Sequence, residues 1–140
     1  MKVLVIDNAE QIAPLLFGSS AEVLCFADEI QALNAAEQQK PELIFLDYAV
    51  LDKQTPEYIR LLIDVSDNSK LVVIGNQLSE DDIFRCLLMG AQGYQDSRLL
   101  PNYISKLIKV IMQGEAWVTR KMVARVLEAI RQLDAQSITG

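Results

Sequence analysis

The sequence contains no histidine among its 140 residues. This absence excludes a serine–histidine triad, a histidine general base and any zinc site that needs imidazole ligands. The two cysteines, Cys25 and Cys86, form no CxxC pair and no disulfide framework, so both are expected to be small buried hydrophobes in a reducing cytoplasm. Any chemistry must therefore depend on carboxylates, hydroxyls, lysines or a metal ion.

Several nucleotide-binding and membrane patterns are also missing. The sequence has no GxGxxG and no GxxxxGK[ST], and the segment Asn8-Ala9-Glu10-Gln11 lacks the hydroxyl-rich turn expected around a flavin phosphate. No apolar run approaches the ~20 residues that span a bilayer, and the N-terminus shows no signal-peptide pattern. We therefore expect a cytoplasmic protein with no membrane contact.

Charge is distributed unevenly along the chain. Residues 1–97 carry 6 Lys or Arg and 16 Asp or Glu, a net charge of −10, whereas residues 98–140 carry 7 and 3, a net charge of +4. An acidic body argues against nucleic-acid binding by this domain itself. The basic C-terminal part is interpreted as a solvated helix face or a partner contact.

Short apolar runs alternate with amphipathic stretches through most of the chain. Strands are expected at Lys2–Ile6, Glu22–Phe26, Leu43–Leu46, Leu71–Ile74 and Gly93–Gln95. Helices are expected at Glu10–Phe17, Glu29–Gln39, Pro56–Val65, Ser79–Gly90 and Pro101–Gly114. Five such repeats with short links predict an α/β domain with a doubly wound parallel sheet.

One further helix is predicted over Thr119–Leu133, where apolar residues recur on a single stripe. A five-stranded sheet leaves this helix no position to cover. Packing against the body, a linker and a dimer contact are therefore all open. The polar end, Asp134–Gly140, is expected to be frayed.

Two of the apolar runs end abruptly in a carboxylate, Asp7 after the first and Asp47 after the third. If the strand order is the flavodoxin-like 2-1-3-4-5, the first and third strands are neighbours, and Asp7, Asn8 and Asp47 would converge beyond their carboxyl ends. Two acids in that place could bind a hard cation, and one could carry a phosphoryl group. Each could also be an ordinary polar end of a strand.

With these features the whole chain resembles the receiver (CheY-like) domain of bacterial response regulators. The matching segments are Val3-Leu4-Val5-Ile6-Asp7-Asn8, Pro41-Glu42-Leu43-Ile44-Phe45-Leu46-Asp47 and Gly90-Ala91-Gln92-Gly93-Tyr94. The segment Gly114-Glu115-Ala116-Trp117-Val118-Thr119 followed by a helix is similar to the NarL/FixJ class, in which a LuxR-type helix-turn-helix domain follows. The resemblance implies a receiver domain over residues 1–115, with residues 116–140 as an extra helix and linker toward such an output domain.

The resemblance also implies a site and partners for transcription regulation in a two-component system. Asp47 would accept a phosphoryl group from a histidine kinase, and Mg²⁺ would be held by Asp7, Asn8, Asp47 and the backbone carbonyl of Ala49. A homodimer and a DNA-binding output domain in the full-length protein would be the other partners. The domain would not be an enzyme beyond self-phosphorylation and autodephosphorylation at Asp47.

The sequence departs from the family pattern at several supporting positions. Asn8 replaces an acid, Gly75 replaces the Ser or Thr after the fourth strand, and Ser97 replaces the Lys after the fifth. Leu51 and Thr55 replace a proline and a glycine in the loop after Asp47. Arg98 is an improbable substitute for the lysine, because a shift of one residue turns a side chain to the opposite side.

Tyr94 occupies the position of the aromatic residue that switches in the family. Because Gly75 provides no hydroxyl to trigger that switch, a simple packing role for Tyr94 is an equal alternative. The preferred interpretation is an atypical receiver with weak or absent phosphorylation switching, which acts through the surface of its fourth helix, fifth strand and fifth helix. A conventional receiver phosphorylated on Asp47 is the alternative. A flavodoxin-like cofactor binder or enzyme is a third hypothesis, and it has little support because the sequence shows no phosphate-binding loop.

Overall fold

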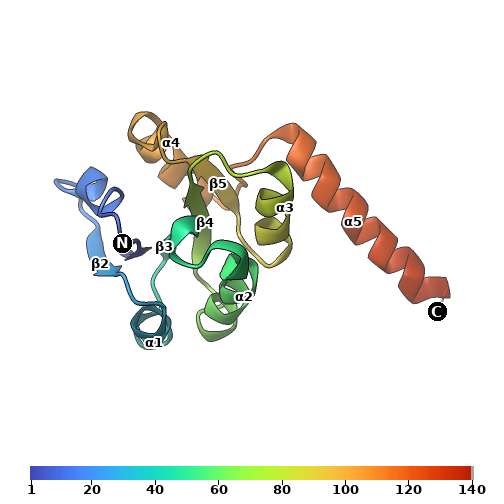
Figure 1. Cartoon of the computed structure of the whole chain (residues 1–140), viewed down its shortest axis with the longest axis horizontal. Coiled ribbons are helices and arrows are strands. Elements are labelled where there is room, and N and C mark those ends of the chain that lie inside the picture. The colour runs from blue at the N-terminus through green and yellow to red at the C-terminus, as the bar shows by residue number, and fades with distance from the viewer. Residues whose placement is uncertain (140) are drawn as a thin grey trace.

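The structure, a computed structural model, describes residues 1–139. Five parallel strands form one sheet in the order β2-β1-β3-β4-β5, which confirms the predicted flavodoxin-like order (Figure 1). The strands are β1 (Lys2–Ile6), β2 (Glu22–Phe26), β3 (Leu43–Asp47), β4 (Lys70–Gly75) and β5 (Gly93–Asp96). Among the described residues, no helix combines the length and the apolar character that a bilayer crossing requires.

Both faces of the sheet are covered, which is why the central strands are apolar at every position. Alternate side chains of β1 and β3, such as Leu4 and Leu46, pack beneath α1 (Glu29–Gln39), α2 (Thr55–Val65) and α3 (Glu80–Leu88). The intervening side chains, such as Val5 and Phe45, pack on the opposite face against α4 (Leu100–Met112) and the short 3-10 helix η1 (Ala13–Leu16). Figure 1 shows α4 on one side of the sheet with α1 and α2 on the other.

The predicted helix over Glu10–Phe17 is wrong, because only η1 forms between β1 and β2. Pro14 supplies no N–H for a longer helix. The backbone N–H groups of Gln11 and Ile12 donate instead to the Asp7 carboxylate, which bends this stretch into a turn. The prediction that both cysteines are buried is correct for Cys86 and wrong for Cys25, which is exposed because it lies on the edge strand β2.

The last helix, α5 (Arg120–Thr139), is longer than predicted. The polar segment from Asp134 was expected to be frayed, yet the helix continues through it, and no Gly or Pro interrupts it before Gly140, which lies outside the described residues. The beginning of α5 packs against α3, and Figure 1 shows the remainder projecting away from the body. Lys121 Nζ lies 3.2 Å from Glu80 Oε1, and Arg125 Nη2 lies 2.7 Å from Asp81 Oδ1.

Candidate functional site

The structure brings Asp7 and Asp47 to the same edge of the sheet. Ile6 and Leu46 are register partners in the β1–β3 pair, and each carboxylate comes directly after one of them. Asp7 is 7% exposed and Asp47 is 3% exposed. The two acids therefore share a buried position at the carboxyl ends of neighbouring strands, where open α/β sheets place their ligands.

Neutral N–H donors surround both carboxylates. Asp7 Oδ1 accepts a hydrogen bond from Ala9 N at 2.8 Å, and Asp7 Oδ2 accepts from Gln11 N at 2.9 Å and Ile12 N at 3.3 Å. Asp47 Oδ1 accepts from Ala49 N at 3.0 Å, and Asp47 Oδ2 accepts from Gln11 Nε2 at 3.2 Å. Backbone and amide dipoles thus stabilise the pair.

Burial raises the pKa of Asp47 above its usual range, and the adjacent Asp7 carboxylate raises it further. The hydrogen bonds from Ala49 N and from the Gln11 amide act in the opposite direction, because they stabilise the charged form. No salt bridge within the described part of the chain joins either acid to a Lys or Arg side chain. Asp47 is therefore a carboxylate without a cationic partner.

The predicted Mg²⁺ ligands Asp7, Asn8, Asp47 and the Ala49 carbonyl stay a prediction. Asn8 is exposed, and no hydrogen bond joins its side chain to either carboxylate. Ala49 lies in a short 3-10 helix, η2 (Tyr48–Val50), and contributes its N–H to Asp47. Across residues 1–139, no three Cys, Asp or Glu side chains gather as metal ligands do.

The switch position after β4 is filled by a neighbouring side chain. A Cβ atom added to Gly75 would lie 2.7 Å from Leu78 Cγ and 2.8 Å from Leu78 Cδ1, closer than real contacts allow. Position 75 therefore has no room for a Ser or Thr side chain while Leu78 keeps its place. Sequence reasoning missed Leu78, although a bulky apolar residue in the loop after this glycine was a visible signal.

Tyr94 is held by the same loop. Its hydroxyl donates to the Gly75 carbonyl at 3.1 Å and accepts from Leu78 N at 3.4 Å. Leu78 also packs against the core cluster beneath α3, as does the Tyr94 ring. The ring is thus tied to the β4–α3 connection by polar contacts at its tip and by apolar contacts along its sides.

The basic residues in the segments that follow β3 and β5, Lys53 and Arg98, have other partners. Arg98 Nε lies 3.0 Å from Asp96 Oδ1, and Lys53 Nζ lies 2.9 Å from Asp82 Oδ1. Ser97, at the position of the expected lysine, donates its backbone N–H to the Gly75 carbonyl at 2.8 Å. Within residues 1–139, no ammonium or guanidinium group thus forms a salt bridge with Asp47.

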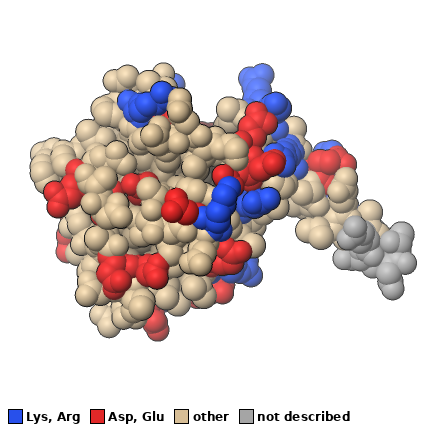
Figure 2. Space-filling view, in the orientation of Figure 1, with Lys and Arg blue, Asp and Glu red and all other residues tan. Residues whose placement is uncertain are grey.

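The C-terminal segment adds a connection that the sequence did not reveal. Trp117 forms a parallel bridge to Gly93, in which Tyr94 N donates to Trp117 O at 3.1 Å and Trp117 N donates to Gln92 O at 3.0 Å. The Trp117 indole also donates to Gln95 Oε1 at 3.0 Å. The segment before α5 therefore covers the β5 edge, and α5 then lies against α3, where Figure 2 shows acidic and basic side chains side by side.

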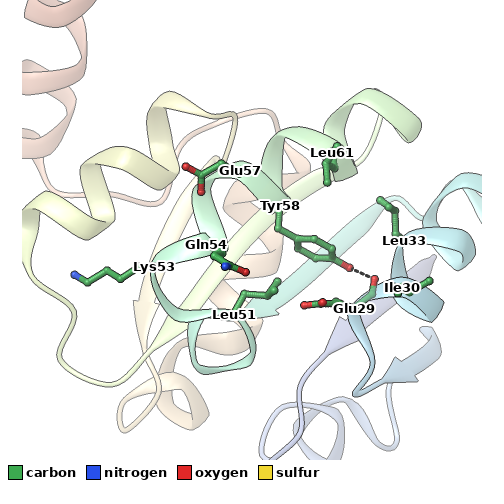
Figure 3. Close-up of a pocket in the computed structure, with 9 residues that line it drawn as sticks. All are labelled: Glu29, Ile30, Leu33, Leu51, Lys53, Gln54, Glu57, Tyr58 and Leu61. Carbon is green, nitrogen blue, oxygen red and sulfur yellow. Dashed lines mark hydrogen bonds between the residues drawn. The ribbon is translucent and has the colours of Figure 1, made fainter.

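A surface groove of about 540 Å³ lies elsewhere, between α1 and α2. Most of its lining is apolar and includes Ile30, Leu33 and Leu61. The polar residues that also line it are Glu29, Lys53, Gln54 and Glu57 (Figure 3). The Tyr58 hydroxyl crosses its floor and donates to the Glu29 carbonyl at 2.6 Å. Such a lining lacks the converging polar groups of a catalytic or phosphate-binding pocket.

Comparison with known proteins gives structural matches alone. No protein-family model matches the sequence, and no curated protein matches it. The isolated REC domain of RcsB from Salmonella enterica serovar Typhimurium, in the apo form, is similar with a TM-score of 0.76, 16% identity and coverage of 91% of this chain and 98% of that chain.

Two further solved structures give the same result. A two-component response regulator of the LuxR family from Aurantimonas sp. SI85-9A1 matches with a TM-score of 0.74, 13% identity and coverage of 91% and 96% of the two chains. A LuxR family DNA-binding response regulator from Silicibacter pomeroyi matches with a TM-score of 0.72, 23% identity and coverage of 86% and 98%. This chain therefore has the fold of response-regulator receiver domains.

Proposed function

We propose that this protein is a receiver-type signalling domain that acts through protein contacts and in which phosphorylation is only weakly coupled to the output surface. The arrangement of Gly75, Leu78 and Tyr94 carries the proposal. Leu78 fills the space beside Gly75 from which a hydroxyl would bind phosphoryl oxygens. The Tyr94 hydroxyl, on the aromatic ring that would respond, is hydrogen-bonded to backbone atoms. A two-state element needs a ligand that favours one state, and here the contact that would do so is missing.

The chemistry at Asp47 supports the same conclusion. Phosphoryl transfer to a carboxylate requires the negative charge of both partners to be neutralised. Asp47 receives neutral donors from Ala49 and Gln11, and its neighbour Asp7 adds negative charge. Charge-assisted hydrogen bonds are about twice as strong as neutral ones, so a phosphoryl group here would lack its strongest stabilising contacts.

The surface predicted from the sequence consists of α3, β5 and α4, which are the predicted fourth helix, fifth strand and fifth helix. Because α5 packs against α3, we propose instead that the output contact is the surface formed by α3, β5 and the N-terminal half of α5. Electrostatic pairs hold α5 on α3, and Arg125 also lies over the Phe84 ring, 4.1 Å from its centroid. Along its length α5 also exposes the apolar residues Val123, Leu127, Ile130 and Leu133. Their spacing forms one stripe of the kind that pairs helices, and we propose a second copy of the chain or an attached DNA-binding domain as its partner.

A conventional receiver, phosphorylated on Asp47 by a histidine kinase, is the second candidate. The observation that favours it is that Asp47 is retained at the end of β3 beside Asp7. Under this alternative the phosphoryl group would need only the nucleophile and a weakly bound cation, and Tyr94 would move after modification.

A phosphorylation assay separates the two candidates. The protein is incubated with a small phosphodonor and Mg²⁺, and the intact mass and the dimer fraction are measured for the wild type, for Asp47→Ala and for Asp67→Ala, an exposed acid outside the site, as a matched control. Our proposal expects little adduct and an unchanged dimer fraction in all three. A stable adduct that is lost only in Asp47→Ala and that shifts the dimer fraction would establish the conventional receiver instead.

The proposed role of α5 has its own test. Leu127 is 47% exposed, so Leu127→Asp should leave the fold intact and reduce self-association in sedimentation experiments. Gln132→Asp, on the opposite side of the helix, is the matched control for added charge. Equal association of both variants with the wild type would remove the second copy as the partner of this stripe.

A further inference from the structure

Among the residues that the structure describes, Gln11 alone donates to both carboxylates of the site. Its backbone N–H donates to Asp7 Oδ2 at 2.9 Å, and its side-chain Nε2 donates to Asp47 Oδ2 at 3.2 Å. These two donors connect the ends of β1 and β3. No feature of the sequence assigned a role to this glutamine.

The loop geometry holds Gln11 in this place. The residue before it, Glu10, adopts φ 54°, a left-handed conformation that non-glycine residues rarely take. The residue after it, Ile12, is fully buried in the core beneath η1, and its N–H also reaches Asp7. A strained residue on one side and a core anchor on the other leave the Gln11 side chain over the acidic pair, and such strain persists only where the surroundings determine it.

We propose that Gln11 is a neutral latch that closes the Asp7–Asp47 site in place of a divalent cation. The amide supplies N–H dipoles to oxygens that would otherwise coordinate the metal, and an ion can approach both carboxylates only after the bond to Asp47 breaks. Asn8, exposed and unbonded to the acids, offers no compensating negative charge. This inference concerns metal binding alone and does not depend on whether Asp47 accepts a phosphoryl group.

The latch makes a specific prediction for metal affinity. The hydrogen bond from Gln11 Nε2 to the Asp47 carboxylate competes with a divalent cation for the same oxygen. Because a hydrogen bond to a charged group contributes roughly 1.5 kcal/mol or more, its removal should increase the affinity for a divalent cation by about tenfold. Gln11→Ala removes the side-chain donor and keeps the backbone N–H on Asp7. Gln11→Glu removes the donor and adds a third carboxylate, so we expect it to bind a divalent cation more tightly than Gln11→Ala.

The experiment measures Mn²⁺ binding by paramagnetic broadening of amide resonances in the wild type, Gln11→Ala, Gln11→Glu and Gln113→Glu. Gln113 is exposed at the end of α4 and controls for the added charge. The expected result is weak broadening around Asp7 and Asp47 in the wild type and in Gln113→Glu, with tighter binding in both Gln11 variants. Equal affinity of the wild type and Gln11→Ala would overturn the latch.

A second measurement needs no change at Gln11. In the wild type, the Gln11 side-chain N–H resonances should shift when Asp47 is replaced by Asn, because the acceptor changes, while those of Gln113 should not. Unchanged Gln11 side-chain resonances in Asp47→Asn would show that the bond to Asp47 is absent in solution and would overturn the proposal.

Discussion

Replacement of Gly75 by alanine should destabilise the protein through one identifiable contact. The added Cβ would lie 2.7 Å from Leu78 Cγ and 3.3 Å from Leu78 Cδ2, and the backbone at Gly75 needs no positive φ, so steric conflict is the sole expected cost. Overpacking of this kind costs about 1–3 kcal/mol of unfolding free energy. Trp117 is the only tryptophan in the sequence, and its fluorescence can follow urea denaturation.

A double-mutant cycle isolates this contact. Leu78→Ala removes the atoms that the new Cβ would meet, so Gly75→Ala should cost about 0.5 kcal/mol or less in the Leu78→Ala background. The coupling free energy between the two positions should therefore be at least about 1 kcal/mol. If Gly75→Ala costs the same in both backgrounds, Leu78 does not fill the space beside Gly75 and the reasoning about the missing hydroxyl fails. In the same background, Gly75→Ser should be accommodated, which would restore the hydroxyl that this site lacks.

Two other perturbations test separate parts of the fold. The Lys53 ammonium lowers the pKa of Asp82. A carboxyl whose pKa is lowered on folding stabilises the protein at pH values above its pKa in the unfolded chain, about 3.9. This stabilisation is lost as the pH falls through the pKa of the folded state. Because Lys53 is 74% exposed, Lys53→Met should cost about 0.2–1 kcal/mol at pH 7 and progressively less in acid, as measured by urea denaturation across pH; a loss independent of pH would contradict this. Gly93→Ala would place a Cβ 2.9 Å from the Trp117 carbonyl oxygen, so the bridge between Trp117 and β5 should open. We expect faster exchange of the backbone amides before α5 and a red shift of the Trp117 fluorescence emission. An unchanged emission spectrum would show that the bridge tolerates a side chain at position 93.

The sheet could be predicted because its signals are local. The continuous apolar runs of β1 and β3 require cover on both faces, and short links between alternating elements leave few possible topologies. The register then brings Asp7 and Asp47 together without further information. Ser79 was recognised as the start of α3 for a similar reason, and its hydroxyl accepts from Asp82 N at 3.1 Å.

The parts that were missed depend on contacts between distant residues or on competition for a hydrogen bond. The stretch after β1 has helical spacing, yet the Asp7 carboxylate captures its N–H groups before a helix can form. Leu78 gains its role only because the chain folds back over Gly75, and Trp117 gains its role only beside the β5 edge. Neither placement follows from spacing along the sequence, so the support for Asp47 could be judged only in part before the structure.

The central claim is that events at Asp47 do not reach the surface formed by α3 and β5. It is tested most directly by two-dimensional NMR of the wild type and of Asp47→Ala, with and without a phosphomimetic such as BeF₃⁻ in the presence of Mg²⁺. We expect any resonance changes to stay within the loops around Asp7 and Asp47, while Leu78, Tyr94 and the amides of α3 keep their chemical shifts. Concerted changes at Leu78, Tyr94 and α3 that disappear in Asp47→Ala would contradict it.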